Sequence, residues 1–248
     1  MSTGTKTIAF FGASGGTGLS ALRYSLKAGH QCIALCRYPA KLTSIFPPES
    51  TPNLRVVEGN AKVAADVAKC LLKAGDGSSA SLVDEIVFTV GAKPVLHKMT
   101  IDDPTVCRVA MACVLETVAD LRATKGATGR PHIIACSTTG LSKHGRDYPI
   151  ALWPIYGLML KVPHEDKQAM EDSLRASGET YTIMRPSLLT DGETEKSIRV
   201  GVEDFKEGRL SQAVGYTISR EDTGKWIAQN LLLQKDAKYI NKAVMVTY

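Results

Sequence analysis

The stretch from Ile8 to Gly18, which reads Ile-Ala-Phe-Phe-Gly-Ala-Ser-Gly-Gly-Thr-Gly, constrains the fold of this chain more than any other. Its first four residues are apolar and predict a short buried strand. Glycines follow at positions 12, 15 and 18, and leucines three and four residues apart then predict a helix over 17–28. A second apolar run, 31–36, begins two residues after Gly29. The sequence therefore predicts a strand, a glycine turn, a helix and a second strand.

Each glycine of this G-x-x-G-x-x-G spacing has a physical task. Gly12 permits the turn out of the strand, Gly15 lets a phosphate approach the backbone, and Gly18 lets the helix pack close to the strand. The helix start offers free N–H groups and a positive dipole end to a diphosphate. Because a strand precedes the loop and a helix follows it, we interpret the loop as a dinucleotide site, with Ser14 and Thr17 among its contacts.

The end of the second predicted strand indicates which dinucleotide binds. Sites for NAD carry an Asp or Glu here, which holds the ribose hydroxyls. This chain has Cys36 followed by Arg37, with Lys41 behind it. A guanidinium pairs with a 2′-phosphate in a fork, whereas a carboxylate would repel it. The position therefore favours NADP(H) over NAD(H), although a solvated loop cation is the alternative interpretation of Arg37.

The rest of the chain alternates predicted strands with predicted helices. Alternation of this kind, with short and largely apolar strands, predicts an α/β fold with a Rossmann-type, doubly wound parallel sheet. We expect one domain over 1–248, with a small C-terminal substrate lobe and substrate-covering segments at roughly 141–165 and 188–218. The further predicted strands are 54–58, 82–90, 132–137, 181–185 and 244–246. Helices are predicted over 62–74, 164–177 and 223–234. A further long helix is predicted to be capped by Asp103-Pro104 and to be ended by residues 126–130.

Four segments together resemble a known family. They are Arg37-x-Pro-Ala-Lys41, Asp166-Lys167-x-x-Met170-Glu171, Tyr181-Thr-Ile-Met-Arg185-Pro186-Ser187 and Ile218-Ser-Arg-Glu-Asp222. With the glycine motif, they resemble the atypical short-chain dehydrogenases, and more narrowly the NAD(P)-binding, NmrA-like and biliverdin-reductase-B-like branch. The resemblance covers essentially the whole chain and implies an NADP(H) site at the strand ends. It also implies that Ser137 and the Arg185–Ser187 segment border the nicotinamide.

The expected cofactor contacts lie in the glycine loop and where strands end. They are Gly12, Ser14, Gly15, Thr17, Gly18, Arg37, Lys41, Asn60, Gly91, Ser137 and Pro186. Ligands in open parallel sheets bind outside the carboxyl ends of the strands, where these positions are expected.

The proton donor is less clearly indicated. Short-chain dehydrogenases generally use Tyr-x-x-x-Lys, and none of the eight tyrosines here has a lysine four residues later. Tyr156 comes nearest, with Lys161 five residues on. We expect Ser137 to orient the substrate and either His164 or Tyr156 to donate the proton, directly or through water. The alternative for His164 is a partly exposed residue at a helix start.

Composition narrows the function further. The net charge of +5 comes from dispersed residues, so the sequence indicates neither a nucleic-acid partner nor a membrane surface. The six cysteines lie in apolar patterns without C-x-x-C, which favours reduced thiols over disulfides or metal ligands. Residues 1–7 are too short for a secretory signal, and no stretch approaches ~18 uninterrupted apolar residues, so we expect a cytoplasmic protein.

Three functions fit these observations. The first is an NADP(H)-dependent oxidoreductase acting on a small apolar or aromatic molecule of the carbonyl or quinone type. The second is an NADP-sensing regulatory protein of the NmrA-like type, and the third is a non-redox, isomerase-like enzyme on the same fold. Fold alone does not decide among them.

Overall fold

The computed structural model describes residues 4–74, 80–95, 100–154, 160–234 and 236–248. Within these residues, nine strands form one sheet with the order β11-β10-β13-β8-β7-β4-β1-β2-β3. The strands of this sheet are β1 (Thr7–Phe11), β2 (Gln31–Cys36), β3 (Leu54–Glu58), β4 (Glu85–Phe88), β7 (His132–Cys136), β8 (Thr180–Pro186), β10 (Arg199–Asp204), β11 (Gly208–Ser211) and β13 (Lys242–Thr247).

The pairs from β3 to β13 are all parallel, which confirms the predicted Rossmann-type arrangement. Two short pairs lie outside the large sheet: the parallel β9 (Leu188–Thr190) and β12 (Thr217–Ser219), and the antiparallel β5 (Pro94–Val95) and β6 (Thr100–Ile101). Among the described residues, no helix combines the length and the apolar character that crossing a bilayer requires.

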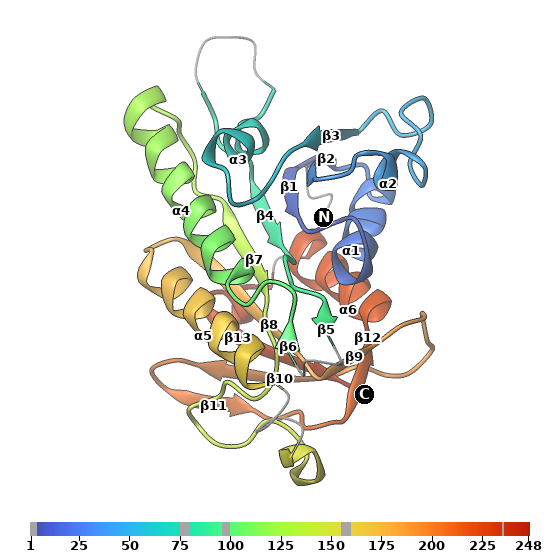
Figure 1. The fold of residues 1–248 in the computed structure, drawn as a ribbon, viewed down its shortest axis with the longest axis vertical. Coiled ribbons are helices and arrows are strands. Elements are labelled where there is room, and N and C mark those ends of the chain that lie inside the picture. The colour runs from blue at the N-terminus through green and yellow to red at the C-terminus, as the bar shows by residue number, and fades with distance from the viewer. Residues whose placement is uncertain (1–3, 75–79, 96–99, 155–159, 235) are drawn as a thin grey trace.

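Helices cover both faces of the sheet (Figure 1). They are α1 (Gly16–Lys27), α2 (Ala40–Thr43), α3 (Ala64–Leu71), α4 (Val106–Lys125), α5 (Lys161–Ala176) and α6 (Arg220–Ile227), the last continued by a π-helical segment, Ala228–Leu233. One apolar core joins the sheet to α3, α4 and α5, and a second joins the opposite face to α1, α6 and the π-helical segment. Burial of these two faces is the main force that holds the layers together.

The antiparallel hairpin β10–β11 extends the sheet beyond β13, in a region where the sequence predicted only a substrate-covering segment at roughly 188–218. Its Glu203 is buried because it pairs with Arg185, the largest fully buried side chain described. Arg185 Nε and Nη2 donate to the two Glu171 oxygens at 3.1 and 2.6 Å, and Nη1 donates to Glu203 Oε1 at 3.0 Å. Burial alone would lower the pKa of Arg185, but the two carboxylates raise it. The guanidinium therefore stays charged and links α5, β8 and β10.

The N-terminus of α4 corrects one expectation. The Asp103 carboxylate accepts the N–H and the hydroxyl of the N-cap residue Thr105, both at 3.3 Å, but it reaches no N–H group within α4. Instead, the buried Asp166 of α5 accepts the N–H groups of Cys107 and Arg108, at 2.8 and 3.1 Å. A carboxylate at this place satisfies free N–H groups and complements the helix dipole. This contact fixes the start of α5 against the start of α4.

Candidate functional site

The glycine loop between β1 and α1 has the close packing that its spacing predicts. Gly12 has a φ of +96°, and a Cβ there would lie 2.6 Å from the carbonyl carbon of Thr89. A Cβ on Gly18 would collide with the Thr89 hydroxyl and would lie 2.6 Å from the Gly12 carbonyl oxygen. Both glycines are therefore needed for β1, α1 and the end of β4 to meet. Gly15 differs, because a Cβ there would have no neighbour within 4 Å.

This open space is where a diphosphate fits. Gly15 is the N-cap residue of α1 and is exposed, as is Ser14. The Thr17 hydroxyl in the first turn is buried and has no hydrogen-bond partner among the described residues. A buried polar atom without a partner is rare in a folded protein and calls for a ligand or water. The loop residues thus fit a dinucleotide, with the helix start supplying N–H donors.

The residues after β2 and β3 fit the adenosine end of such a cofactor. Arg37 is exposed and forms no ion pair with any described residue. Lys41 is also exposed and lies 5.5 Å from the ring centre of Tyr38. Asn60 follows β3, where its amide oxygen accepts the Lys62 N–H at 3.1 Å. Two cations are thus accessible beside the end of β2.

The carboxyl ends of β4, β7 and β8 form the neighbouring part of the site. Ser137 directly follows β7 and is 4% exposed, yet its hydroxyl has no partner among the described residues. Its N–H donates to the Met184 carbonyl at 2.6 Å, which fixes the backbone beside β8. Gly91, after β4, is exposed with open space around it, and Pro186 at the end of β8 is buried. A second unpartnered hydroxyl thus lies at the edge expected for the nicotinamide.

Lys167 of α5 belongs to this edge, although the sequence did not assign it a role. Its ammonium donates to the carbonyls of Val90 and Cys136, at 3.2 and 2.6 Å. These carbonyls lie at the carboxyl ends of β4 and β7, so a fixed positive charge stands beside Ser137. The available signal was the presence of Lys167 in the family-like segment Asp166-Lys167-x-x-Met170-Glu171, and in the structure the capping of α4 by Asp166 aims this turn of α5 at the sheet edge.

The structure describes only one of the two candidate proton donors. His164 lies in the first turn of α5, where burial lowers the pKa of its imidazole to about 4. The ring is therefore neutral at pH 7, and its charged form is scarce. Tyr156 lies outside the described residues.

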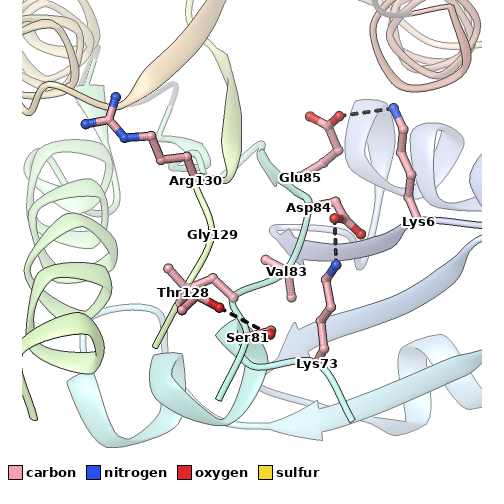
Figure 2. A pocket seen from close by; sticks show the side chains of 10 residues that line it. Lys6, Lys73, Ser81, Val83, Asp84, Glu85, Thr128, Gly129 and Arg130 are labelled. Carbon is pink, nitrogen blue, oxygen red and sulfur yellow. Dashed lines mark hydrogen bonds and ion pairs between the residues drawn. The ribbon is translucent and has the colours of Figure 1, made fainter. Parts of the chain in front are cut away.

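Two cavities lie away from this edge. One, of about 290 Å³, is at the amino-terminal ends of the strands (Figure 2). Four of its charged side chains form two ion pairs, since Lys6 contacts Glu85 at 3.1 Å and Lys73 contacts Asp84 at 2.6 Å. Because ligands of such sheets bind at the opposite ends of the strands, we do not assign this cavity to the site.

The other cavity lies in the segment after Ser137. It measures about 550 Å³ and is lined by Arg146, Ile150, Ala151, Trp153 and Pro154. The side chains of Ile150 and Trp153 are 69% and 66% exposed, which is unusual for large apolar groups. A cavity of this size and character is within the range that holds small organic ligands.

Comparisons with known proteins agree with this geometry. A family model described as NAD(P)H-binding matches residues 12–233. The reductase pytE of Aspergillus terreus is 41% identical over 273 aligned residues that span all of both chains. The oxidase pynE of Aspergillus niger is 28% identical over 280 aligned residues, covering 97% of this chain and 98% of that protein.

Solved structures show the same fold at low sequence identity. A short-chain dehydrogenase/reductase from Veillonella parvula in complex with NADP superposes with a TM-score of 0.69, at 18% identity, over 98% of this chain and 94% of that one. The anaerobilin reductase ChuY of Escherichia coli gives a TM-score of 0.63, at 19% identity, over 97% of this chain and 96% of that one. At such identities the likeness concerns the fold.

Proposed function

The chain belongs to the NAD(P)H-binding family of atypical short-chain-dehydrogenase-like proteins, and we propose that it is an NADPH-dependent reductase of a small apolar or aromatic carbonyl or quinone-type molecule. The observation that carries the proposal is the buried, unpartnered hydroxyl of Ser137, which lies beside Lys167 at the carboxyl edge of the sheet. A hydroxyl there can donate a hydrogen bond to a substrate oxygen on which negative charge develops.

The cofactor preference rests on Arg37. Its exposed guanidinium has no ionic partner among the described residues and follows β2, where NAD sites carry a carboxylate. In this proposal Arg37 and Lys41 bind the 2′-phosphate, while the Gly12–Gly18 loop and Thr17 bind the diphosphate. The NADP named in the Veillonella parvula complex supports the same choice.

The protein's part in the reaction is to position the substrate against the cofactor and to allow protonation of the reduced product. A bound NADPH supplies the hydride; the chain orients it against the substrate and provides hydrogen-bond donors. Ser137 orients the substrate oxygen, and the Lys167 ammonium lies at the same strand ends. Because His164 is neutral at pH 7, the proton that completes the reduction comes from Tyr156 or from water.

The names of the two fungal relatives, a reductase and an oxidase, both denote redox turnover and therefore favour this function over a sensor or an isomerase. The test is the oxidation of NADPH, followed at 340 nm, by the purified protein with a panel of quinones, flavins and aromatic carbonyl compounds. Gly15→Val is the matched control, since it blocks the diphosphate space in a folded protein. Tight NADPH binding without turnover on any acceptor would instead support the NADP-sensing function.

The proton donor is tested once an acceptor is found. Tyr156→Phe and His164→Ala are compared at saturating NADPH. We expect His164→Ala to keep most of the turnover and Tyr156→Phe to lose it. Full turnover in both would assign the proton to water, with the chain only positioning the reactants.

A further inference from the structure

The N-terminus of α6 lies directly against the glycine loop. The Ser20 hydroxyl of α1 donates to the Glu221 carbonyl at 2.6 Å, and a Cβ on Gly224 would lie 2.7 Å from the Ala21 nitrogen. Two helices thus begin side by side at the carboxyl edge of the sheet (Figure 1). The first residue of α6 is Arg220.

The side chain of Arg220 runs over the loop itself. A Cβ built on Gly16, whose φ is +52°, would lie 2.9 Å from Arg220 Cδ and 3.7 Å from Cγ. The aliphatic part of Arg220 therefore packs on the backbone between Gly15 and Thr17.

The partner that Arg220 has in this structure is weakly held. Nη1 donates to Asp191 Oδ1 at 2.6 Å, with the two side chains 35% and 81% exposed. Exposed pairs of this kind contribute little, and a diphosphate at the loop would offer two negative charges at short range. The cost of exchanging Asp191 for such a ligand is therefore small.

We propose that Arg220 binds the diphosphate of the dinucleotide, and that its guanidinium exchanges Asp191 for the cofactor. The inference rests on the proposed function and deepens it by assigning a third cation to the cofactor site. Arg37 distinguishes the 2′-phosphate, whereas Arg220 contacts a group that NADPH, NADH and ADP share. Asp191 directly follows β9, so the same exchange removes one of the contacts that join the 188–218 segment to α6.

The test is a set of binding titrations with NADPH, NADH and 5′-ADP. Arg220→Met keeps the aliphatic contact with Gly16 and removes the charge, so the fold is retained. We expect it to weaken all three ligands by a similar factor, roughly 10- to 150-fold, as for loss of a charge-assisted contact. Arg23→Met, at an exposed position further along α1, changes the net charge equally and should leave all three affinities unchanged.

A second variant tests whether Arg220 exchanges Asp191 for the cofactor or whether the Arg220–Asp191 ion pair only supports the fold. Asp191→Asn removes the competing carboxylate, and we expect it to strengthen binding roughly two- to fivefold. Equal losses in Asp191→Asn and Arg220→Met would show that the pair acts as a structural unit and would overturn the exchange. If Arg220→Met binds the three ligands with native affinity, the role of Arg220 is overturned while the proposed function stands. Failure of the native protein to bind any of the three ligands would overturn the proposed function with it.

Discussion

Substituting two glycines of one loop separates the binding role of the loop from its structural role. Gly15 and Gly18 are three residues apart, yet their surroundings differ sharply. A Cβ on Gly15 meets nothing within 4 Å, while one on Gly18 lies 2.6 Å from the Gly12 carbonyl oxygen and 3.1 Å from the Ala13 Cα. We therefore expect Gly15→Val to block a ligand and Gly18→Ala to disturb the fold.

The expected size of each effect follows from these distances. At Gly18 the obstructing atoms include the backbone of Gly12 and Ala13 as well as the Thr89 hydroxyl, so β1 and α1 must move apart. Overpacking of this kind costs about 1–3 kcal/mol. At about 2–4 °C per kcal/mol for a chain of this length, the melting temperature should fall by about 2–12 °C. Gly15 has a φ of 179°, which valine adopts readily, so Gly15→Val should shift stability by no more than about 0.5 kcal/mol.

The assay is thermal unfolding combined with fluorescence titration of NADPH. Gly15→Val should melt like the native protein and show no saturable binding of NADPH or NADH, because its side chain fills the diphosphate space. Gly18→Ala should melt at a lower temperature. Native NADPH affinity in Gly15→Val would refute the assignment of the loop, and a Gly15→Val protein as unstable as Gly18→Ala would refute the packing argument.

Three further predictions concern charged groups. Arg37→Ala should weaken NADPH roughly 10- to 150-fold and leave NADH nearly unchanged; equal affinity of the native protein for both would contradict the cofactor preference. Arg185→Met leaves Glu171 and Glu203 buried without their counter-ion, so urea titration should show about 3–5 kcal/mol less stability, and a loss below about 1 kcal/mol would contradict this. Burial lowers the pKa of His164 from 6.5 to about 4. The unfolded state therefore binds this proton first, and stability falls as the pH drops from 6.5 towards 4. His164→Gln should make urea midpoints less sensitive to pH across this range, and an unchanged sensitivity would contradict it.

Local patterns were sufficient for several strands and helix ends along the chain. The predicted strands 31–36 and 54–58 agree with β2 and β3 to the residue. Gly126 ends α4 with a φ of +60°, and Ser219 caps α6 by accepting the Asp222 N–H at 2.9 Å. Each of these signals acts within a few residues of the chain, so a sequence displays it directly.

Contacts between distant residues were beyond the sequence. The β10 strand was missed because its sequence includes Glu203, whose burial is made tolerable by the Arg185 guanidinium and the Ser142 hydroxyl, both from distant parts of the chain. The cap of α4 was assigned to Asp103, while the carboxylate that fills this place, Asp166, comes about 60 residues later.

The candidate site likewise combines residues that local patterns place and residues that only long-range packing places. Apolar runs in the sequence placed the glycine loop, Arg37 and Ser137 at strand ends, and the family resemblance added the expectation that Ser137 borders the nicotinamide. Lys167 and Arg220 lie in two of the segments that resemble the family, but the sequence gave neither residue a role. Their placement depends on which helices pack beside the strand ends, and the α6 contact with α1 is a property of the assembled layers.

The position of β13 has a consequence for the order in which the molecule forms. This strand follows β10 by about 40 residues in the chain, yet in the sheet it lies between β8 and β10. The hairpin β10–β11 therefore has no edge to join until residues 242–247 have paired with β8. Pairing across long stretches of chain is slow, because closing the loop costs entropy before any contact is gained. During synthesis, the strands that precede the hairpin in the chain, from β1 to β8, can therefore pair before the hairpin joins the sheet. Until then Glu203 lies in water and is not paired with Arg185.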